Sequence, residues 1–404
     1  MRISTSQITS AGVREMLLRQ AEIQHTQLQL ATQQRVLTPS DDPVAATAIS
    51  ALESEIEQLE QFNINSDAAK ASNELEESVL SSVTNIFFRV KELMVSLGNG
   101  VYDEQDLDSI SIELQERLKE LVGLANTQNA NGEYLFSGSL VDVKTVTRDI
   151  AGNFVYNGDQ SQRFLRVSSG VVVPTSDHGF DLFVDIKNGN GKFVTSADAA
   201  NTGTGLIDPG SYQAPPNFLT EPYTIAFSVD VNGDTNYTVT GDISGATIIP
   251  ATVWQEGDEI TFNGITTEVN GEPLAGDQFG IAPSTSEDIF SNIQLAIDSI
   301  TSFQDTEAGR ALFYNAITGI QETLDRNMEN IDLHRGKIGA QLNVVESEFE
   351  SNLFLLVTSQ SSLSEIKDLD VVEASTRFSQ QLVVLEAAQA SFVRVQGLNL
   401  FNFL

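Results

Sequence analysis

The feature that most constrains this chain is a long stretch with helical periodicity and no residue that breaks a helix. Neither Gly nor Pro occurs between Val44 and Leu97. Its second half carries apolar residues at alternating steps of four and three, which places them on one helix face: Val79, Val83, Ile86, Val90, Leu93 and Leu97. At 1.5 Å per residue such a helix would be about 80 Å long. A face of that length requires partner helices to cover it.

The C-terminal part of the chain supplies similar faces. The first stripe is Ile289, Ile293, Ile297 and Ile300, the second is Phe313, Ile317, Ile320 and Leu324, and the last is Phe378, Leu382, Leu385, Phe392 and Val395. Either each flank folds alone or the two flanks pair with each other. We favour pairing, because each stripe needs a facing partner and the termini of one domain often lie close together.

The middle of the chain has a different character. Eight of the ten prolines lie between Pro174 and Pro283, and 17 of the 28 glycines lie between Gly152 and Gly280. Short alternating segments are followed by turn signals at Asn157-Gly158, Asn232-Gly233 and Asn263-Gly264. This pattern is typical of antiparallel hairpins in a sandwich or barrel. The fold class is therefore α+β and multidomain, an elongated antiparallel helical bundle or coiled coil made from both chain ends, with an inserted all-β domain.

Composition excludes several functions. The net charge of −34 argues against nucleic-acid binding, which needs a basic face. There is no Cys, and the three His are far apart in sequence, so we expect no metal site. The apolar run Leu353 to Val357 is far shorter than the ~20 residues of a membrane span. Asp230, Asn232 and Asp234 begin like a calcium loop but lack its Gly and Glu, so we interpret them as a turn. We expect no enzyme activity, no catalytic residue and no cofactor.

The two chain ends differ from the acidic remainder. Residues 1–40 carry four Arg and two Glu, and residues 378–404 carry only Glu386 and Arg394. A weak heptad seam is formed by Met16, Ile23, Leu30 and Leu37. The terminal residues include Leu400, Phe401 and Phe403, whereas a free terminus is normally polar. The ends therefore need partners.

Five segments carry a family resemblance. They are Thr38-Pro39-Ser40-Asp41-Asp42-Pro43-Val44-Ala45-Ala46, Asn131-Gly132-Glu133-Tyr134-Leu135-Phe136-Ser137-Gly138, Gly276-Asp277-Gln278-Phe279, Ile366-Lys367-Asp368-Leu369-Asp370 and the opening Met1-Arg2-Ile3-Ser4-Thr5. Together they resemble the bacterial flagellin family. The prolines of the first segment and the Tyr134 to Gly138 form of the second resemble the branch at the hook–filament junction more than the filament subunits. The resemblance covers both flanks but not the middle.

The resemblance implies a domain plan and a role. Residues 1–44 and 371–404 would form an inner helical domain that is disordered in the monomer. Residues 45–145 and 284–370 would form a helical rod, and residues 146–283 an outer β-rich domain. The role would be a structural, extracellular subunit of the flagellum, needed for filament attachment and swimming, and exported without a cleaved signal peptide.

The resemblance also implies partners. They are identical subunits in a ring or tube, hook-associated protein 1, flagellin, and a cytoplasmic flagellar export chaperone that holds the stripe from Phe378 to Val395. Arg89, Leu93 and Glu113 resemble flagellin positions that make lateral subunit contacts, although an exposed helix face with ion pairs explains them equally well. Two alternatives stay open: a minor flagellin, and an adhesin or carbohydrate-acting protein working through the β domain.

Overall fold

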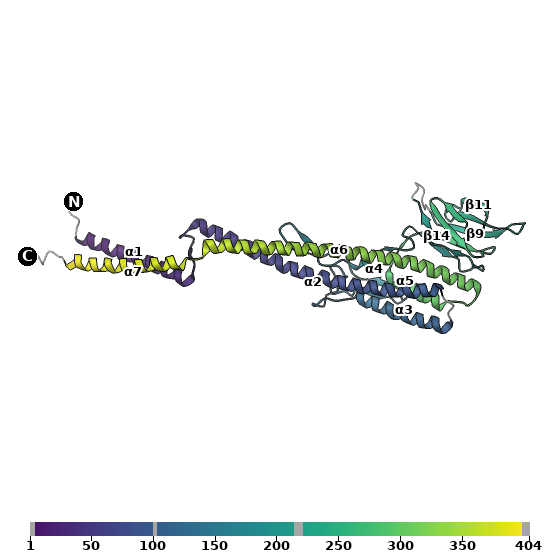
Figure 1. The fold of residues 1–404 in the computed structure, drawn as a ribbon, viewed down its shortest axis with the longest axis horizontal. Coiled ribbons are helices and arrows are strands. Elements are labelled where there is room, and N and C mark those ends of the chain that lie inside the picture. The colour runs from purple at the N-terminus through teal and green to yellow at the C-terminus, as the bar shows by residue number, and fades with distance from the viewer. Residues whose placement is uncertain (1–4, 100–102, 214–220, 398–404) are drawn as a thin grey trace, which may run out of the picture. The chain divides into compact units, whose positions relative to one another are not determined.

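The computed structural model describes residues 5–99, 103–213 and 221–397 (Figure 1). The chain forms two compact units. Unit 1 comprises Met1–Asn65, Val167–Ser169 and Ser347–Leu404, and unit 2 comprises Ser66–Arg166 and Gly170–Glu346. The long helices α2 (Pro43–Asn99) and α6 (Glu307–Lys367) contribute residues to both units. None of the helices in these described ranges has the length and apolar content needed to cross a membrane.

Unit 1 brings the two ends of the chain together. Helix α1 (Thr5–Thr32) lies antiparallel beside α7 (Val371–Gly397), as Figure 1 shows. The segments that leave α1 and enter α7 are tied to each other by backbone hydrogen bonds, from Arg35 N to Lys367 O at 2.8 Å and from Leu369 N to Gln33 O at 3.0 Å. The predicted pairing of the two flanks is therefore confirmed in this unit.

Unit 2 contains the larger helical core. Helices α2 and α6 pack with α3 (Glu104–Ala125) and α5 (Ile289–Thr301). The stripe predicted on α2 is buried throughout, and it faces the buried residues Phe313, Ile317, Ile320, Leu324, Ile331 and Ile338 of α6. An ion pair from Arg335 Nη2 to Glu77 Oε1 at 2.7 Å and another between Lys91 and Asp325 show that α2 and α6 run antiparallel. Each fully buried aliphatic side chain contributes about 1.5–3 kcal/mol, so this core dominates the stability of the unit.

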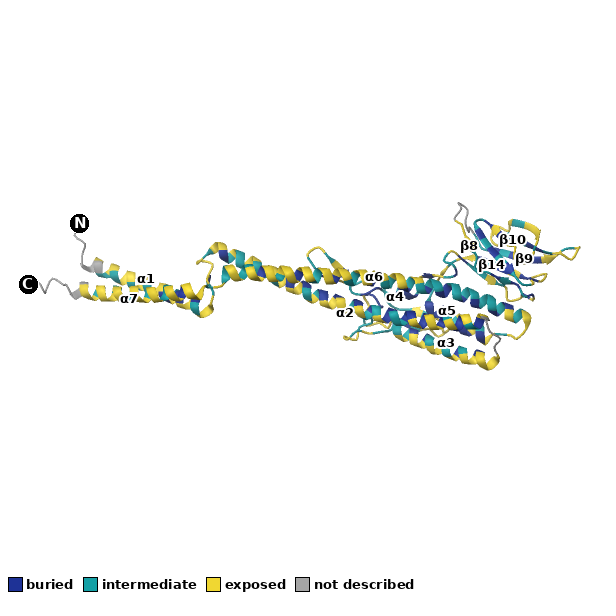
Figure 2. Ribbon diagram, in the orientation of Figure 1, coloured by how far each residue is buried: buried dark blue, intermediate teal, exposed yellow. Residues whose placement is uncertain are grey.

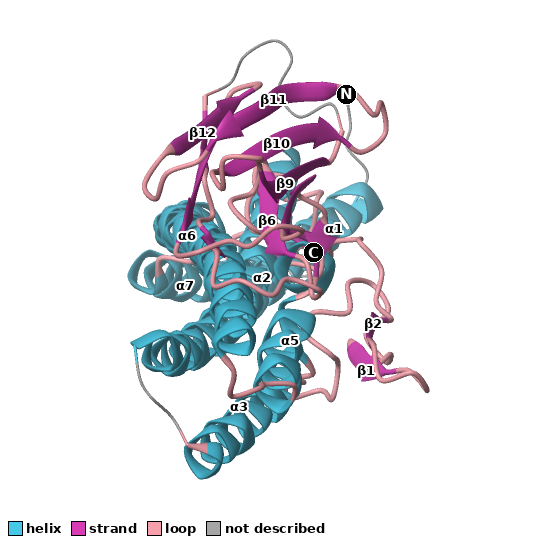
Figure 3. Ribbon diagram, turned by 90° about the vertical axis from the view of Figure 1, so that its right-hand side faces the viewer, coloured by secondary structure: helices cyan, strands magenta, loops and turns pink. Residues whose placement is uncertain are grey.

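A second core in unit 2 is built from two antiparallel sheets. One has the order β11-β10-β9-β14-β6, and the other has the order β12-β13-β7 with β8 beside β13. Their bounds are β6 (Phe193–Ala197), β7 (Leu206–Ile207), β8 (Ser211–Tyr212), β9 (Tyr223–Val229), β10 (Thr235–Gly241), β11 (Thr247–Val253), β12 (Glu259–Phe262), β13 (Ile265–Asn270) and β14 (Gln278–Pro283). Figure 3 shows β9, β10 and β11 side by side. Residues from both sheets meet in one cluster, for example Tyr223 and Phe262, whose ring centroids are 5.2 Å apart. The strands thus form a sandwich, one of the two predicted forms.

The short strands before Phe193 lie outside this sandwich. They are β1 (Val146–Arg148), β2 (Phe154–Tyr156), β3 (Phe164–Arg166), β4 (Val172–Pro174) and β5 (Ile186–Lys187), with α4 (Gly179–Phe183) and the later β15 (Ser286–Glu287). They pair only two by two, so they cannot bury a sheet face of their own. Strands β1, β2 and β5 contribute residues to the helical core instead. Val146, Phe183 and Ile186 pack into the core of the helices. The strand-built core therefore spans Phe193 to Ile281, a shorter segment than the 146–283 expected from glycine and proline content.

Two of the predicted turns have different outcomes. Asn263 and Gly264 link β12 to β13 with φ angles of 45° and 81°, the left-handed geometry that Asn-Gly hairpins adopt. Asn157-Gly158 follows β2, but β2 pairs with the preceding strand β1, so Asn157-Gly158 does not form the turn of a hairpin. Gly158 is needed there for space, because a Cβ atom would lie 2.5 Å from the Tyr156 hydroxyl.

Candidate assembly surfaces

Most of the residues predicted as assembly contacts at the two chain ends lie in the interface between α1 and α7. Ile23 is buried, and Met16 and Leu30 are half-buried on α1; Phe378, Leu385 and Phe392 are half-buried on α7. A Cβ atom on Gly12 would come within 2.7 Å of the Phe392 ring, so glycine allows the two helices their close approach. Arg377 Nη2 donates to Gln29 Oε1 at 3.2 Å across the same interface. The weak heptad seam of α1 and the stripe of α7 therefore face each other.

The remaining predicted end residues lie elsewhere. Leu382 is 40% exposed on the outer side of α7, and Leu37 is half-buried in the segment that follows α1. Val395 belongs to α7, but its side chain is not described, and Leu400, Phe401 and Phe403 lie outside the described residues.

Many apolar side chains of the α1–α7 pair face outward. Among the described residues, the exposed large ones are Val13, Leu17, Leu18 and Leu28 of α1 and Val371, Val372, Leu382, Val383, Val384 and Val393 of α7. Figure 2 shows the outer faces of both helices mostly in the colour of exposed residues. Two helices can cover only one face of each other, so this apolar surface stays open in a single copy. We call these ten residues the outer apolar face; a surface of this kind marks an interaction site.

The segment between α1 and α2 is ordered by two carboxylates. Asp41 Oδ2 accepts from the N–H groups of Thr38 at 2.8 Å and Leu37 at 3.0 Å, and these bonds hold the pKa of Asp41 below its usual value. Asp42 Oδ1 accepts from Ala45 N at 3.0 Å, which caps the start of α2 and lowers the pKa of Asp42. Both acids therefore order the segment that enters α2.

Of the residues predicted to make lateral subunit contacts, Arg89 is exposed but Leu93 is buried. Arg89 forms a two-pronged contact with Glu113 across α2 and α3, through Nε to Oε1 at 2.6 Å and Nη2 to Oε2 at 2.9 Å. This pairing holds the pKa of Glu113 below its usual value. Leu93, in contrast, is 6% exposed and lies in the helical core. Its assignment as a contact residue is wrong, because the same chain already covers it; the exposed apolar neighbours are Phe88 and Ile112.

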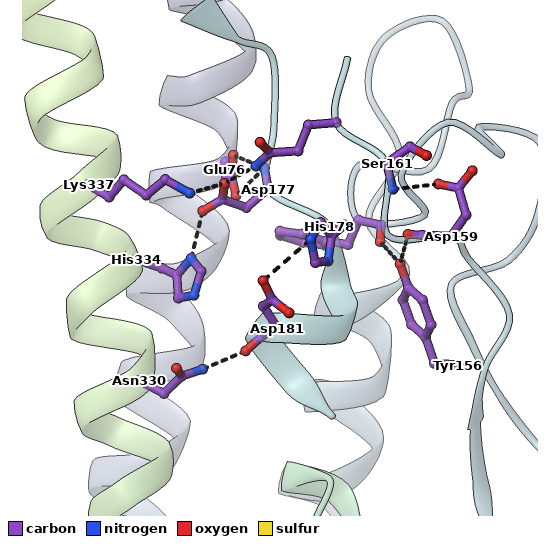
Figure 4. Close-up of polar contacts among 12 residues, drawn as sticks. Glu76, Tyr156, Asp159, Ser161, Asp177, His178, Asp181, Asn330, His334 and Lys337 are labelled. Atoms are coloured by element: carbon purple, nitrogen blue, oxygen red, sulfur yellow. Dashed lines mark hydrogen bonds and ion pairs between the residues drawn. The ribbon is translucent and has the colours of Figure 1, made fainter. Parts of the chain in front are cut away.

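A buried polar cluster joins α2, α6 and the segment before α4 (Figure 4). Asp177 accepts from His334 Nδ1 at 2.6 Å and from Lys337 Nζ at 2.9 Å, while its own N–H donates to both carboxylate oxygens of Glu76, at 3.1 and 3.2 Å. Burial opposes the charge of Asp177, but His334 and Lys337 outweigh it and keep the pKa of that carboxyl below its usual value. Burial, followed by repulsion from Asp177, raises the pKa of the fully buried Glu76 well above its usual value.

The positions of this cluster explain why sequence reasoning missed it. Glu76, Asp177 and His334 are each separated by about a hundred residues or more, and no local spacing links Glu76 to Asp177 or Asp177 to His334. Among the described residues, no group of three or more His, Asp or Glu side chains is arranged to hold a metal ion. The cluster ties three elements of unit 2 together.

Replacing Glu76 with Gln should raise the thermal unfolding midpoint at pH 8. A carboxyl with a raised pKa binds its proton more tightly in the folded state, so its charged form costs stability once the pH exceeds the ordinary value. Gln keeps an acceptor for Asp177 N–H without the charge, and each 1 kcal/mol gained shifts the midpoint by about 2–4 °C. Calorimetry from pH 8 down to pH 4 should show the gain shrinking as native Glu76 becomes protonated.

The neighbouring residue provides a matched control. Glu77 is half-buried and paired with Arg335, so Glu77→Gln removes an attraction and should not raise the midpoint. If Glu76→Gln leaves the midpoint at pH 8 unchanged or lowers it, the charged form of Glu76 does not destabilise the folded state.

Comparison with known proteins gives consistent matches. Residues 3–140 match the bacterial flagellin N-terminal helical region, and residues 321–404 match the bacterial flagellin C-terminal helical region. Flagellar hook-associated protein 3 of Escherichia coli K12 is 25% identical over 403 residues, which cover 100% of this chain and 99% of that protein. By contrast, flagellin FlaB1 of Treponema pallidum is 25% identical over 185 residues, which cover 44% of this chain and 61% of that protein.

Solved structures agree with the sequence matches. The crystal structure of flagellar hook-associated protein 3 from Legionella pneumophila is 32% identical, with a TM-score of 0.76, and the match covers 79% of this chain and 98% of that one. FlgL from Xanthomonas campestris is 28% identical with a TM-score of 0.67, covering 76% of this chain and 98% of that one.

Proposed function

Because the chain belongs to the bacterial flagellin family, we propose that it is a structural subunit of the flagellum that forms the junction between hook and filament. The observation that carries this proposal is the extent of the match to hook-associated protein 3, which includes the middle of the chain. The match to flagellin FlaB1 of Treponema pallidum covers 44% of the chain. The role is structural, and it uses helices and their surfaces rather than reactive groups.

The outer apolar face supplies a driving force for assembly. In a ring or tube of identical subunits, neighbouring α1–α7 pairs would bury the side chains that a single copy leaves exposed. An isolated pair of helices with a narrow seam recovers little of the entropy lost on ordering. We therefore propose that the two ends become fully ordered only on assembly. Slow hydrogen exchange within residues 5–32 of the isolated protein would contradict this coupling.

The proposed partners follow from the place of a junction. One side of the assembly would contact hook-associated protein 1 and the other side flagellin, after export without a cleaved signal peptide. Before export, a cytoplasmic chaperone would cover the α7 stripe, including Leu385 and Phe392. Since Phe392 also packs against Gly12 of α1, chaperone binding and α1–α7 pairing would exclude each other. Leu385→Asp with Phe392→Asp should abolish chaperone binding in a pull-down; unchanged affinity would reject this placement.

Deleting the gene and restoring it tests the function. A strain without this chain should make hooks, release flagellin into the medium and fail to swim, and the full chain should restore attached filaments. Immunogold labelling should then mark one zone at the base of each filament. Labelling along the whole filament would instead identify a minor flagellin.

A further inference from the structure

A groove of about 510 Å³ lies on one flank of the helical core of unit 2, between α3, α5 and the hairpin that β1 and β2 form (Figure 3). Its walls combine apolar side chains with two amides and two cations: Leu118, Val122, Phe154 and Ile297, then Gln115 and Gln294, then Lys119 and Arg148. An apolar surface with a few polar groups around it is typical of a binding site. The groove shares no residue with the outer apolar face.

Arg148 is fixed at this groove but has no carboxylate partner. Its guanidinium carbon lies 4.4 Å from the centre of the Phe154 ring, and its Nη2 donates to Gln294 Oε1 at 2.8 Å. Arg148 is exposed, and no Asp or Glu among the described residues forms an ion pair with it, whereas Lys119 pairs with Glu116 at 2.6 Å. In a chain of net charge −34, a fixed cation without a carboxylate can accept an acid from outside the chain.

The proposed junction brings identical subunits together, and every one of them carries this excess of negative charge. Such subunits repel each other, and an acid of one copy that meets Arg148 of the next replaces repulsion with attraction. A subunit of a ring or tube also contacts its two neighbours through different surfaces. The occupant of the groove is therefore expected to be an exposed apolar side chain beside a carboxylate, on another flank of unit 2.

The exposed phenylalanines of unit 2 offer two candidates for this occupant. Among the described residues of the unit, Phe88 and Phe164 are each 57% exposed. Phe164 shares the outer face of β3 with Arg166, a cation that Arg148 would repel. Phe88 lies on the rigid helix α2, so it can enter a groove at a smaller cost in conformational entropy than a loop residue.

The surroundings of Phe88 carry the charge opposite to that of the groove. Arg89 is bound by Glu92 at 2.6 Å and by Glu113 at 2.6 Å, so the three groups together keep one negative charge. Glu113 lies on the flank of α3 that faces α2, whereas the groove lies on the flank of α3 beside α5. Helix α3 thus separates Phe88 from the groove of the same copy.

We propose that Phe88 and Glu92 of one copy dock into the Arg148 groove of the next copy. This inference rests on the proposed function, because the junction is what brings the copies together. The Phe88 ring would cover the apolar floor of the groove, and the Glu92 carboxylate would accept from the Arg148 guanidinium. Arg89 would keep its two-pronged contact with Glu113. Because the contact joins two different surfaces, it can continue from copy to copy.

Cross-linking between introduced cysteines tests this contact directly, since the chain has no Cys. Asn85, one helical turn before Phe88, and Gln115, in the groove, are both exposed. In flagella of a strain that carries only the full-length variant with Asn85→Cys and Gln115→Cys, a short bis-maleimide should link the chains into dimers and longer oligomers. Neither single variant should be linked. The matched control combines Asn85→Cys with Glu259→Cys, an exposed position of β12, and should give no oligomers.

Charge reversal provides a second measurement. Arg148→Glu should lower the fraction of cells with attached filaments at least tenfold, and adding Glu92→Arg should restore it, because the attraction returns with exchanged signs. A purely structural role of Arg148 would not be rescued from α2, since Glu92 pairs with Arg89 in the single copy.

Three results would overturn the proposal: normal filaments in Arg148→Glu, no rescue by Glu92→Arg, or cross-linked dimers of the Gln115→Cys single variant, in which groove would meet groove. Absence of oligomers in the double-cysteine variant would overturn it as well. If immunogold labelling still marks one zone at the base of each filament in that case, this contact is wrong and the proposed function stands. Labelling along the whole filament would instead count against the function itself.

Discussion

Replacing both Leu17 and Leu18 with Gln is expected to abolish swimming while leaving the thermal unfolding of the isolated protein unchanged. Each leucine is 60% exposed, so the single copy gains little from either side chain. Burial in an assembly would be worth about 1.5–3 kcal/mol for each leucine that becomes fully covered. That loss would recur in every subunit. Gln has nearly the helix propensity of Leu, so α1 itself is preserved.

The measurement compares two properties of the same variant. Calorimetry on the purified chain reports the monomer, and a swimming assay with electron microscopy of attached filaments reports the assembly. Leu333→Gln is the matched control, since this leucine is 72% exposed on α6 in unit 2 and lies outside the outer apolar face. Normal motility of the Leu17 and Leu18 variant, or a clearly lowered unfolding midpoint, would count against assembly through this face.

Periodicity was sufficient to predict the helical half of this fold. The stripe from Val79 to Leu97 is buried because a run without Gly or Pro has few alternatives to a helix, and its apolar face must be covered. Pairing of the flanks followed from the same need. The extent of the sandwich could not be predicted in this way, because glycine and proline mark turns both inside and outside a sandwich. Strands such as β1 look like sandwich strands in the sequence, yet their side chains complete the helical core.

Side-chain roles were harder to predict than elements. Ile23 and Phe392 were chosen as contacts with other copies, yet they first serve the contact between α1 and α7. Leu93 lies on an α2 face that carries both the core stripe and, one turn earlier, the exposed Arg89. Long-range packing decides which side of a helix faces another helix of the same chain and which side faces another subunit. This packing cannot be read from the spacing of residues in one sequence. The same is true of Asp177 and His334.

Replacing Leu93 with Asp is expected to unfold the helical core of unit 2 and to prevent junction formation for that reason. Leu93 is 6% exposed among the buried residues of α2, α3, α5 and α6. Loss of a buried leucine alone costs about 2–5 kcal/mol. A carboxylate in the same place also lacks a partner, which adds the cost of an uncompensated buried charge. The total is comparable with the whole stability of a typical domain, about 5–15 kcal/mol.

The variant Arg89→Ala distinguishes loss of folding from loss of a lateral contact between subunits. Arg89 lies one helical turn from Leu93 but is exposed, and exposed ion pairs contribute little to folding. Urea unfolding followed by circular dichroism should therefore show a large drop in midpoint for Leu93→Asp and almost none for Arg89→Ala. If Arg89→Ala remains folded but loses attached filaments, the Arg89–Glu113 surface contacts a neighbouring subunit. If Leu93→Asp folds normally, Leu93 cannot occupy the core position that the structure gives it, and the packing of α2 against α3 and α6 would have to be different.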